Sequence, residues 1–170
     1  MTTFRLRTLK LRPGEQYRDR LPIRLEPLRY GGELYTPVLE APEAELTVAR
    51  MTSGTLFELS LNASLEGPCI RCLEPAGLEV SVHAREYQAN VPESEEMQTP
   101  YITDDRLDLS AWARDAIALS LPEQIVCEEA CKGLCAGCGA NLNVEECRCG
   151  PDQADPRWQK LAELRDRLGT

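Results

Sequence analysis

Alternation of apolar and polar residues is the strongest pattern in this chain, and it predicts β-strands. Across residues 55–66 every second side chain from Phe57 onward is apolar, and those between are polar. A repeat of two over that length fits a strand and not a helix. Residues 78–85 alternate in the same way after it, and residues 44–51 before it predict a partner strand. Three neighbouring strands joined by short turns predict an antiparallel meander with one solvent-exposed face.

The N-terminal segment carries a related pattern in which the polar positions are basic. Residues 4–12 alternate apolar and basic side chains, with one slip at Thr8. Because one extra residue reverses the facing of a strand, this predicts an edge strand with a bulge. A shorter alternation follows at residues 21–25, and the pair Gly31-Gly32 predicts a turn.

The second half of the chain changes from strand to loop and helix patterns. Residues 88–108 are acidic and poor in large apolar side chains, which predicts a loop. Residues 109–121 carry apolar side chains at helical spacing, after Asp108 or Ser110 as the N-cap, and Pro122 follows at the end.

The expected fold class is α+β: an antiparallel β-meander or partial barrel with a few helices and a C-terminal cysteine-rich zinc knuckle. We expect residues 1–122 to form the β-rich core domain and residues 123–170 to form the metal-binding segment. Asp155 and Pro156 are typical of a helix start, and the apolar spacing that follows predicts a short C-terminal helix.

Cysteine content changes the chemical picture. A chain of 170 residues buries a core without crosslinks, yet it has eight cysteines. Its first residues lack the apolar region of a signal peptide, and no run is long enough to cross a bilayer. The expected location is the cytoplasm, where clustered thiols favour metal or redox chemistry. A secreted disulfide protein is the alternative.

Charge is distributed unevenly along the chain. The net charge is −9, but residues 1–30 hold eight basic and three acidic side chains. Overall acidity argues against a general nucleic-acid coat, whose affinity comes from neutralising phosphates. The basic N-terminal segment keeps a local phosphate contact open, through the side chains of Arg5, Arg7, Lys10 and Arg12. A solvated basic face is the alternative interpretation.

The clearest candidate site is a set of four cysteines near the C-terminus. Cys135 and Cys138 stand two residues apart and are followed by Gly139, which permits a tight turn around an ion. Cys147 and Cys149 form a second closely spaced pair further along the chain. Four thiolates in a closed tetrahedron suit zinc best, and an iron–sulfur cluster is a weaker alternative.

Further cysteines compete for this role. Cys131 and Cys127 could replace one of the four, or could join the earlier pair Cys69 and Cys72 in a second site. We therefore expect one zinc ion, with two as the alternative. Cys69 and Cys72 also match the spacing of a thiol redox pair, although a turn between strands is not the helix N-terminus that such pairs favour.

Catalytic candidates are few. His83 is the sole histidine, and it falls on the polar face of its strand. A site closed by four cysteines leaves no open position for water, so a metal-dependent hydrolase is the weakest interpretation. We expect no enzymatic activity.

Three segments resemble the YceD family, whose members are linked to accumulation and processing of 23S ribosomal RNA. They are CIRCLEP, DLSAWARDAIALSLPEQIVC and CKGLCAGCGANLN with the later Cys-Arg-Cys and Asp-Pro-Arg. The resemblance covers roughly residues 55–160. It implies a non-secreted, non-enzymatic factor in large-subunit ribosome biogenesis. Some members of the family lack the metal-type cysteines, so the metal is expected to be local structural support.

The partners implied are ribosomal RNA, a large-subunit ribosomal protein or an assembly intermediate, with no membrane and no small-molecule substrate. The N-terminal cations are one expected contact surface, and Arg71 on the hairpin is the other.

Overall fold

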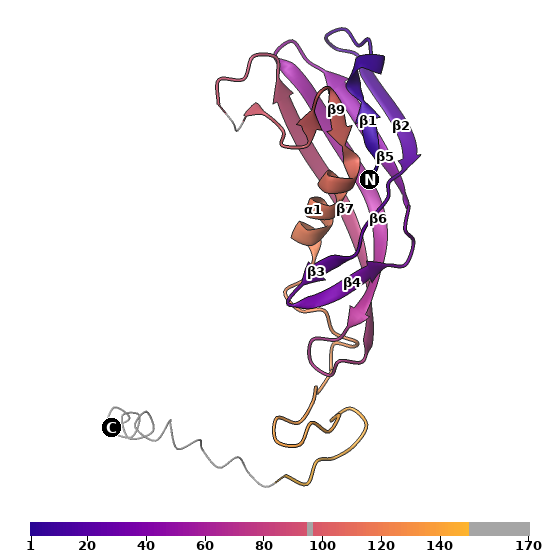
Figure 1. Ribbon diagram of the computed structural model, residues 1–170, viewed down its shortest axis with the longest axis vertical. Helices are drawn as coiled ribbons and strands as arrows, with labels where there is room; N and C mark the ends of the chain where they lie inside the picture. Colours follow the sequence, from indigo (N-terminus) through magenta and orange to yellow (C-terminus); the bar gives the residue numbers. More distant parts are fainter. Residues whose placement is uncertain (95–96, 150–170) are drawn as a thin grey trace, which may run out of the picture.

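The computed structural model describes residues 1–94 and 97–149, which build a long antiparallel sheet covered on one face by a smaller layer (Figure 1). In chain order the elements are β1 (Thr3–Arg5), the 3₁₀ helix η1 (Leu6–Thr8), β2 (Gln16–Pro22), β3 (Leu28–Tyr30), β4 (Glu33–Pro37), β5 (Glu43–Arg50), β6 (Gly54–Pro68), β7 (Pro75–Ala89), β8 (Ile102–Thr103), β9 (Arg106–Asp108) and α1 (Leu109–Ser120).

The large sheet is organised around the long hairpin of β6 and β7, which are 15 residues each. β5 and then β2 extend the sheet on the other edge of β6, and β4 with β3 follow further along that edge. The predicted antiparallel strands are confirmed, and β6 and β7 are longer than the alternation indicated. The predicted partial barrel is not confirmed, because no pairing among the described residues joins the two outer edges of the sheet.

The core lies between the apolar face of this sheet and the layer made by α1 and the small sheet β1–β9–β8. Phe57 and Leu59 on β6 are buried against Leu107, Trp112 and Ile117 from that layer. Asp108 caps α1, since its Oδ1 accepts from the backbone N–H of Ala111 at 3.0 Å. The opposite face of the sheet carries polar pairs, including Glu58 with Arg85 at 2.7 Å.

The N-terminal segment differs from the predicted bulged edge strand. β1 stops at Arg5, and Leu6–Thr8 form a 3₁₀ turn. The hydroxyl of Thr8 donates to the carbonyl of Arg5 at 2.7 Å and so closes this turn. A hydroxyl that bonds local backbone competes with strand pairing, which explains why the alternation continues where the strand does not.

Less of the acidic segment 88–108 is loop than the sequence predicted. β7 continues to Ala89, and residues 102–108 contain the β8–β9 hairpin, which pairs with β1. Its turn residues Asp104 and Asp105 have φ of 50° and 59°. Two consecutive positive φ values are typical of type I′ turns, which match the twist of a hairpin. The predicted helix after Asp155 lies outside the described residues.

Candidate metal centres

All eight cysteines are free thiols, and they separate into two groups of four. Within each group the four sulfur atoms lie within 4.8 Å of one another. The structure therefore brings together both sets of four cysteines that were candidate sites in the sequence. We call them the inner cluster (Cys69, Cys72, Cys127 and Cys131) and the outer cluster (Cys135, Cys138, Cys147 and Cys149).

The inner cluster closes the end of the β6–β7 hairpin. Cys69 and Cys72 stand in the turn between the two strands, and the segment after α1 returns to this turn. The backbone N–H of Ile70 donates to the carbonyl of Ile125 at 2.9 Å, which docks the returning segment beside the turn. Cys69 is completely buried, and Cys131 is 4% exposed. The site is therefore set into the end of the core, and Cys127 is its exposed member.

Arg71 holds the returning segment from the other side. Its guanidinium donates to Oε1 of Gln124 at 3.0 Å and to the carbonyl of Cys131 at 3.1 Å. Its own carbonyl accepts from the N–H of Leu134 at 3.0 Å. Gly133 makes this approach feasible, because its φ is +74° and a Cβ there would meet the Arg71 carbonyl at 3.0 Å. Arg71 thus connects the hairpin to the cysteine-rich segment.

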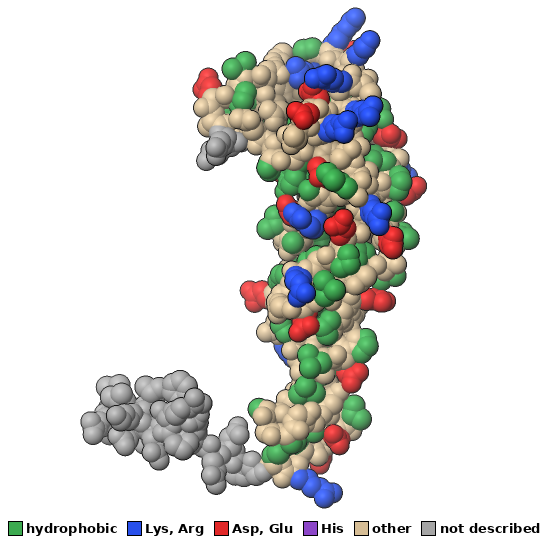
Figure 2. Space-filling model, in the orientation of Figure 1, with side chains coloured by type: hydrophobic (Ala, Val, Ile, Leu, Met, Phe, Trp, Pro, Cys, Tyr) green, Lys and Arg blue, Asp and Glu red, His purple; other side chains and the backbone are tan. Residues whose placement is uncertain are grey.

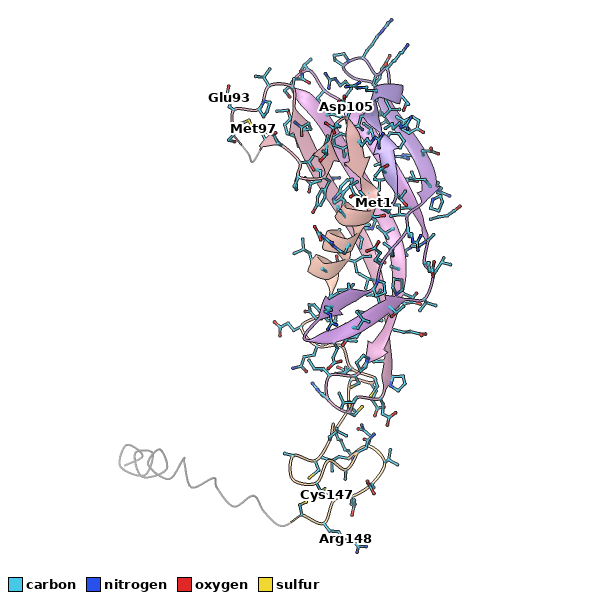
Figure 3. The ribbon with its side chains drawn as sticks, viewed as in Figure 1. Met1, Glu93, Met97, Asp105, Cys147 and Arg148 are labelled. Carbon is cyan, nitrogen blue, oxygen red and sulfur yellow. The ribbon has the colours of Figure 1, made fainter. Side chains whose placement is uncertain are left out.

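The outer cluster follows directly and forms a small loop of its own at the end of the molecule, where Figure 3 labels Cys147. Asn143 links it to the inner cluster. Its Oδ1 accepts from the N–H of Lys132 at 2.7 Å, and its Nδ2 donates to the sulfur of Cys131 at 3.3 Å. The hydrogen bonds of Asn143 thus connect the two clusters, although the clusters share no cysteine.

The two CxxC pairs adopt the same turn. The N–H of Leu73 donates to the carbonyl of Cys69 at 2.9 Å, and that of Gly139 donates to the carbonyl of Cys135 at 2.8 Å. Both residues have positive φ, 63° and 74°. Leu73 occupies the position where glycine is usual, because a Cβ is unfavourable there. Because a leucine and not a glycine follows Cys72, the sequence did not predict that the two pairs form the same turn.

Sulfur separations fit a tetrahedral ion. Sγ of Cys72 lies 3.5 Å from Sγ of Cys127, and Sγ of Cys135 lies 3.4 Å from Sγ of Cys147. A disulfide needs about 2 Å, so these thiols are not placed for bonding to each other. Zinc–sulfur bonds of about 2.3 Å in a tetrahedron place neighbouring sulfurs about 3.8 Å apart. The donor set and its spacing therefore fit zinc.

Each cluster holds a thiol whose ionised form is stabilised. Burial would raise the pKa of Cys69, but backbone N–H groups, those of Cys72 and Cys127 among them, lower that pKa to about 6. For Cys135 the backbone N–H of Cys138 is the main cause, and it lowers the pKa to about 6. A thiolate held this way is the form that binds a metal.

One further thiol in each cluster has a strongly raised pKa. The pKa of Cys127 is raised to about 12, first by its contact with Cys72 and then by burial. The pKa of Cys149 is raised to about 12, first by its contact with Cys138 and then by that with Cys135. Thiolates crowded this closely repel one another, and a bound dication relieves the repulsion.

The predicted contact residues fall at two separate places. Arg5, Arg7, Lys10 and Arg12 are exposed, and Arg7 pairs with Asp105. Arg71 lies at the hairpin turn beside the inner cluster, at the end of the molecule opposite Asp105 (Figures 1 and 3). The structure does not bring Arg71 together with the N-terminal cations.

The fold and the two clusters define a class of protein: an antiparallel β-protein in which a cysteine-rich segment packs at the turn of the longest hairpin. The chain belongs to the YceD family, described as large ribosomal RNA subunit accumulation protein YceD, which matches residues 57–165. The match includes both clusters and α1. None of the solved structures matches the chain.

Curated relatives support this membership. An uncharacterized protein of Mycobacterium tuberculosis is 35% identical over 128 residues, which is 72% of this chain and 61% of the relative. One of Mycobacterium leprae is 32% identical over 142 residues, 80% of this chain and 65% of the relative. The chain thus spans about three fifths of the length of these relatives.

A plant relative carries the family description in its name. The large ribosomal RNA subunit accumulation protein YCED homolog 1, chloroplastic, of Arabidopsis thaliana is 39% identical over 62 residues, 36% of this chain and 19% of the relative. In the part of the chain that the structure describes, no helix is long and apolar enough to cross a membrane.

Proposed function

We propose that this protein is a non-enzymatic factor of large-subunit ribosome biogenesis that supports accumulation of 23S ribosomal RNA in the cytoplasm. Membership of the YceD family carries the proposal, because the family and its plant relative are named for this process. The partner is ribosomal RNA, or a large-subunit protein bound to it. Each cysteine cluster holds one zinc ion as a structural support.

The zinc assignment follows from the chemistry of the donor sets. Four cysteines in each cluster form a closed ligand shell, which is the composition of structural and not of catalytic zinc sites. The inner ion joins the hairpin turn to the segment after α1, and the outer ion folds a loop that has little secondary structure. The zinc then maintains a surface and takes no part in a reaction.

Element analysis of the purified, reduced protein tests this directly. We expect about two equivalents of zinc per chain. Cys127→Ser and Cys138→Ser each replace an exposed thiol, one in each cluster, and each variant should retain about one equivalent. A metal-free protein with an unchanged, ordered cysteine-rich segment would contradict the assignment.

RNA contact is proposed for the N-terminal cations, at the end of the molecule where lysine and arginine side chains gather (Figure 2). Lys10 and Arg12 are exposed there, and phosphate contacts by such side chains give a binding constant that falls steeply with salt. Arg71 is exposed as well, but its guanidinium already bonds Gln124 and Cys131, so its contribution to a partner is secondary.

The measurement for this proposal is binding of the purified protein to 23S rRNA over a range of salt concentrations. Lys10→Glu and Arg12→Glu should weaken binding and each reduce the slope of log affinity against log salt by about one. Lys132→Glu, an exposed lysine in the cysteine-rich segment, is the matched control. In cells, depletion should lower 23S rRNA. Unchanged rRNA on depletion would overturn the proposed function.

The alternative function, a thiol redox protein that uses Cys69 and Cys72, has one observation in its favour, the lowered pKa of Cys69. Accessibility argues against it, because Cys69 is 0% exposed and Cys72 is 3% exposed. A disulfide substrate has to reach the attacking sulfur. Disulfide reductase turnover by the wild-type protein, lost in Cys69→Ser, would restore this alternative.

A further inference from the structure

A cavity of about 490 Å³ lies at the end of the molecule away from the cysteines. Its apolar lining comes from segments that are far apart in the sequence. The N-terminal segment, β5, β6 and β8 supply these residues: Leu6, Leu9, Leu11, Val48, Phe57 and Ile102. The lining as a whole is mixed apolar and polar, and a hollow of this size is large enough for a flat heterocycle.

The N-terminal wall of the cavity is fixed at both ends. The N–H of Leu6 donates to the carbonyl of Asp105 at 2.9 Å, which ties the wall to the β8–β9 turn. The N–H of Gly14 donates to the carbonyl of Arg50 at 2.8 Å, which ties it to the end of β5. The hollow is therefore part of the fold and not a gap between independent segments.

Polar side chains complete the lining. They are Arg50, Thr55, Gln88, Gln98, Thr99 and Asp105. Nη1 of Arg50 is oriented by a 2.8 Å bond to Oγ1 of Thr55, and Oε1 of Gln88 accepts from the N–H of Thr99 at 3.2 Å. Amide and guanidinium groups beside apolar side chains supply the donors and acceptors that the edge of a nucleobase requires.

The surroundings of the cavity are basic. The leucines of the N-terminal wall line the hollow, while the cations between and just after them, Arg7, Lys10 and Arg12, are exposed. Arg5 on β1 and Arg106 on β9 pair directly, but they point to the face of the small sheet opposite to Ile102 and so do not surround the cavity.

Acidic side chains offset only part of this charge. Arg7 pairs with Asp105, which lines the cavity, whereas Lys10, Arg12 and Arg50 form no ion pair among the described residues. The Glu93 side chain stands at the far end of its loop, away from Asp105 at the cavity (Figure 3). The cavity therefore combines a partly apolar lining with exposed cations nearby, at the basic end seen in Figure 2.

We propose that this cavity accepts an unpaired base of single-stranded RNA, with the neighbouring phosphates on the exposed cations. The inference rests on the RNA contact in the proposed function and adds a preference for single-stranded over paired RNA. A base carries both features that the site matches, a flat apolar face with a polar edge and an adjacent negative charge. An apolar peptide would not use the cations.

Three RNA probes test this with the full chain: a single strand of about twelve nucleotides, the same strand with abasic sites at its centre, and the strand annealed to its complement. Fluorescence anisotropy should show the intact single strand binding about tenfold more tightly than the other two. Similar affinity for all three would overturn the base-binding cavity while leaving phosphate contact intact. Absence of binding to any RNA would overturn both.

Single substitutions test whether the preference for the intact single strand arises in this cavity. Leu9→Glu places a carboxylate in the cavity and should abolish the preference for the intact strand. Gln98→Ala, at an exposed position that the core does not need, should reduce the preference about threefold and keep the duplex affinity unchanged. Lys10→Glu should weaken binding of all three probes equally. If Gln98→Ala and a folded Leu9→Glu both retained the full preference, the base would bind elsewhere.

Discussion

At the scale of single residues, the conformation of the two CxxC turns has a measurable consequence. Gly139 has φ of +74° and open space around a Cβ, so Gly139→Ala would be unfavourable through its backbone alone. We expect the substitution to weaken zinc binding at the outer cluster by about 1 kcal/mol, or fivefold to tenfold. Competition with a chromogenic chelator measures this affinity.

Gly77→Ala is the control for that measurement. Gly77 also has open space around a Cβ, but it lies in β7 without a positive φ. Its substitution should leave zinc affinity unchanged. Equal affinities of Gly139→Ala and the wild type would show that the turn does not require the left-handed conformation to bind the ion.

A second residue-scale prediction concerns pH. Burial and, after it, the Asp115 carboxylate raise the pKa of Tyr101 to about 12, from an ordinary value of about 10. The neutral phenol is favoured in the folded state, so its contribution to stability is complete below about pH 10 and is lost as the pH rises towards about 12. Denaturant unfolding at a series of alkaline pH values should show this decline.

Tyr101→Phe isolates the effect. The variant loses the hydrogen bond from the hydroxyl to Oδ2 of Asp115 at 3.2 Å, and with it the group that ionises. The difference in unfolding free energy between wild type and variant should therefore shrink as the pH rises past about 10. A constant difference across this range would contradict the shifted pKa.

At the scale of elements, the start of α1 is set by a side chain. Asp108→Ala removes the acceptor for the N–H of Ala111 and should lower the free energy of unfolding by about 1 kcal/mol. Glu40→Ala removes an exposed carboxylate between β4 and β5, away from the cap, and should change it little. Chemical denaturation of both variants provides the comparison. Equal stabilities would mean that packing of Trp112 alone fixes the helix start.

At this scale, some strands could be predicted from the sequence and others could not. The strands β5, β6 and β7 follow from alternation, because burying one face of a sheet requires that period. The pairing of β9 with β1 did not follow, since strands of two or three residues are too short for any period to be visible. Their turn lacks glycine as well, which removes the usual signal.

The candidate site was predictable in part for a related reason. The outer cluster is local, and the spacing of its four cysteines is visible within one stretch of sequence. The inner cluster needs the chain to return from α1 to the hairpin turn, and no pattern in the sequence indicates that return. The cavity likewise depends on long-range packing, because its apolar lining joins segments from both halves of the described chain.

At the scale of the whole molecule, the two clusters should differ in what their loss does. The inner cluster joins distant parts of the fold, whereas the outer cluster closes one terminal loop. Cys127→Ser should therefore lower the free energy of unfolding by more than about 3 kcal/mol, and Cys138→Ser by much less. Both cysteines are exposed, so the substitutions are matched in solvation. Equal losses would indicate that the inner cluster does not hold the sheet and α1 together.

The separation of the cysteines along the chain also sets an order of events during synthesis. Cys69 and Cys131 of the inner cluster are 62 residues apart, while Cys135 and Cys147 of the outer cluster are 12 apart. Closing a long loop requires the intervening hairpin and helix to have formed, and closing a short one does not. If the clusters bind the zinc ions proposed above, uptake at the inner site would follow folding of the hairpin and α1, and uptake at the outer site would not require it. Under that proposal, a cell short of zinc would accumulate chains that differ in which of the two sites is filled.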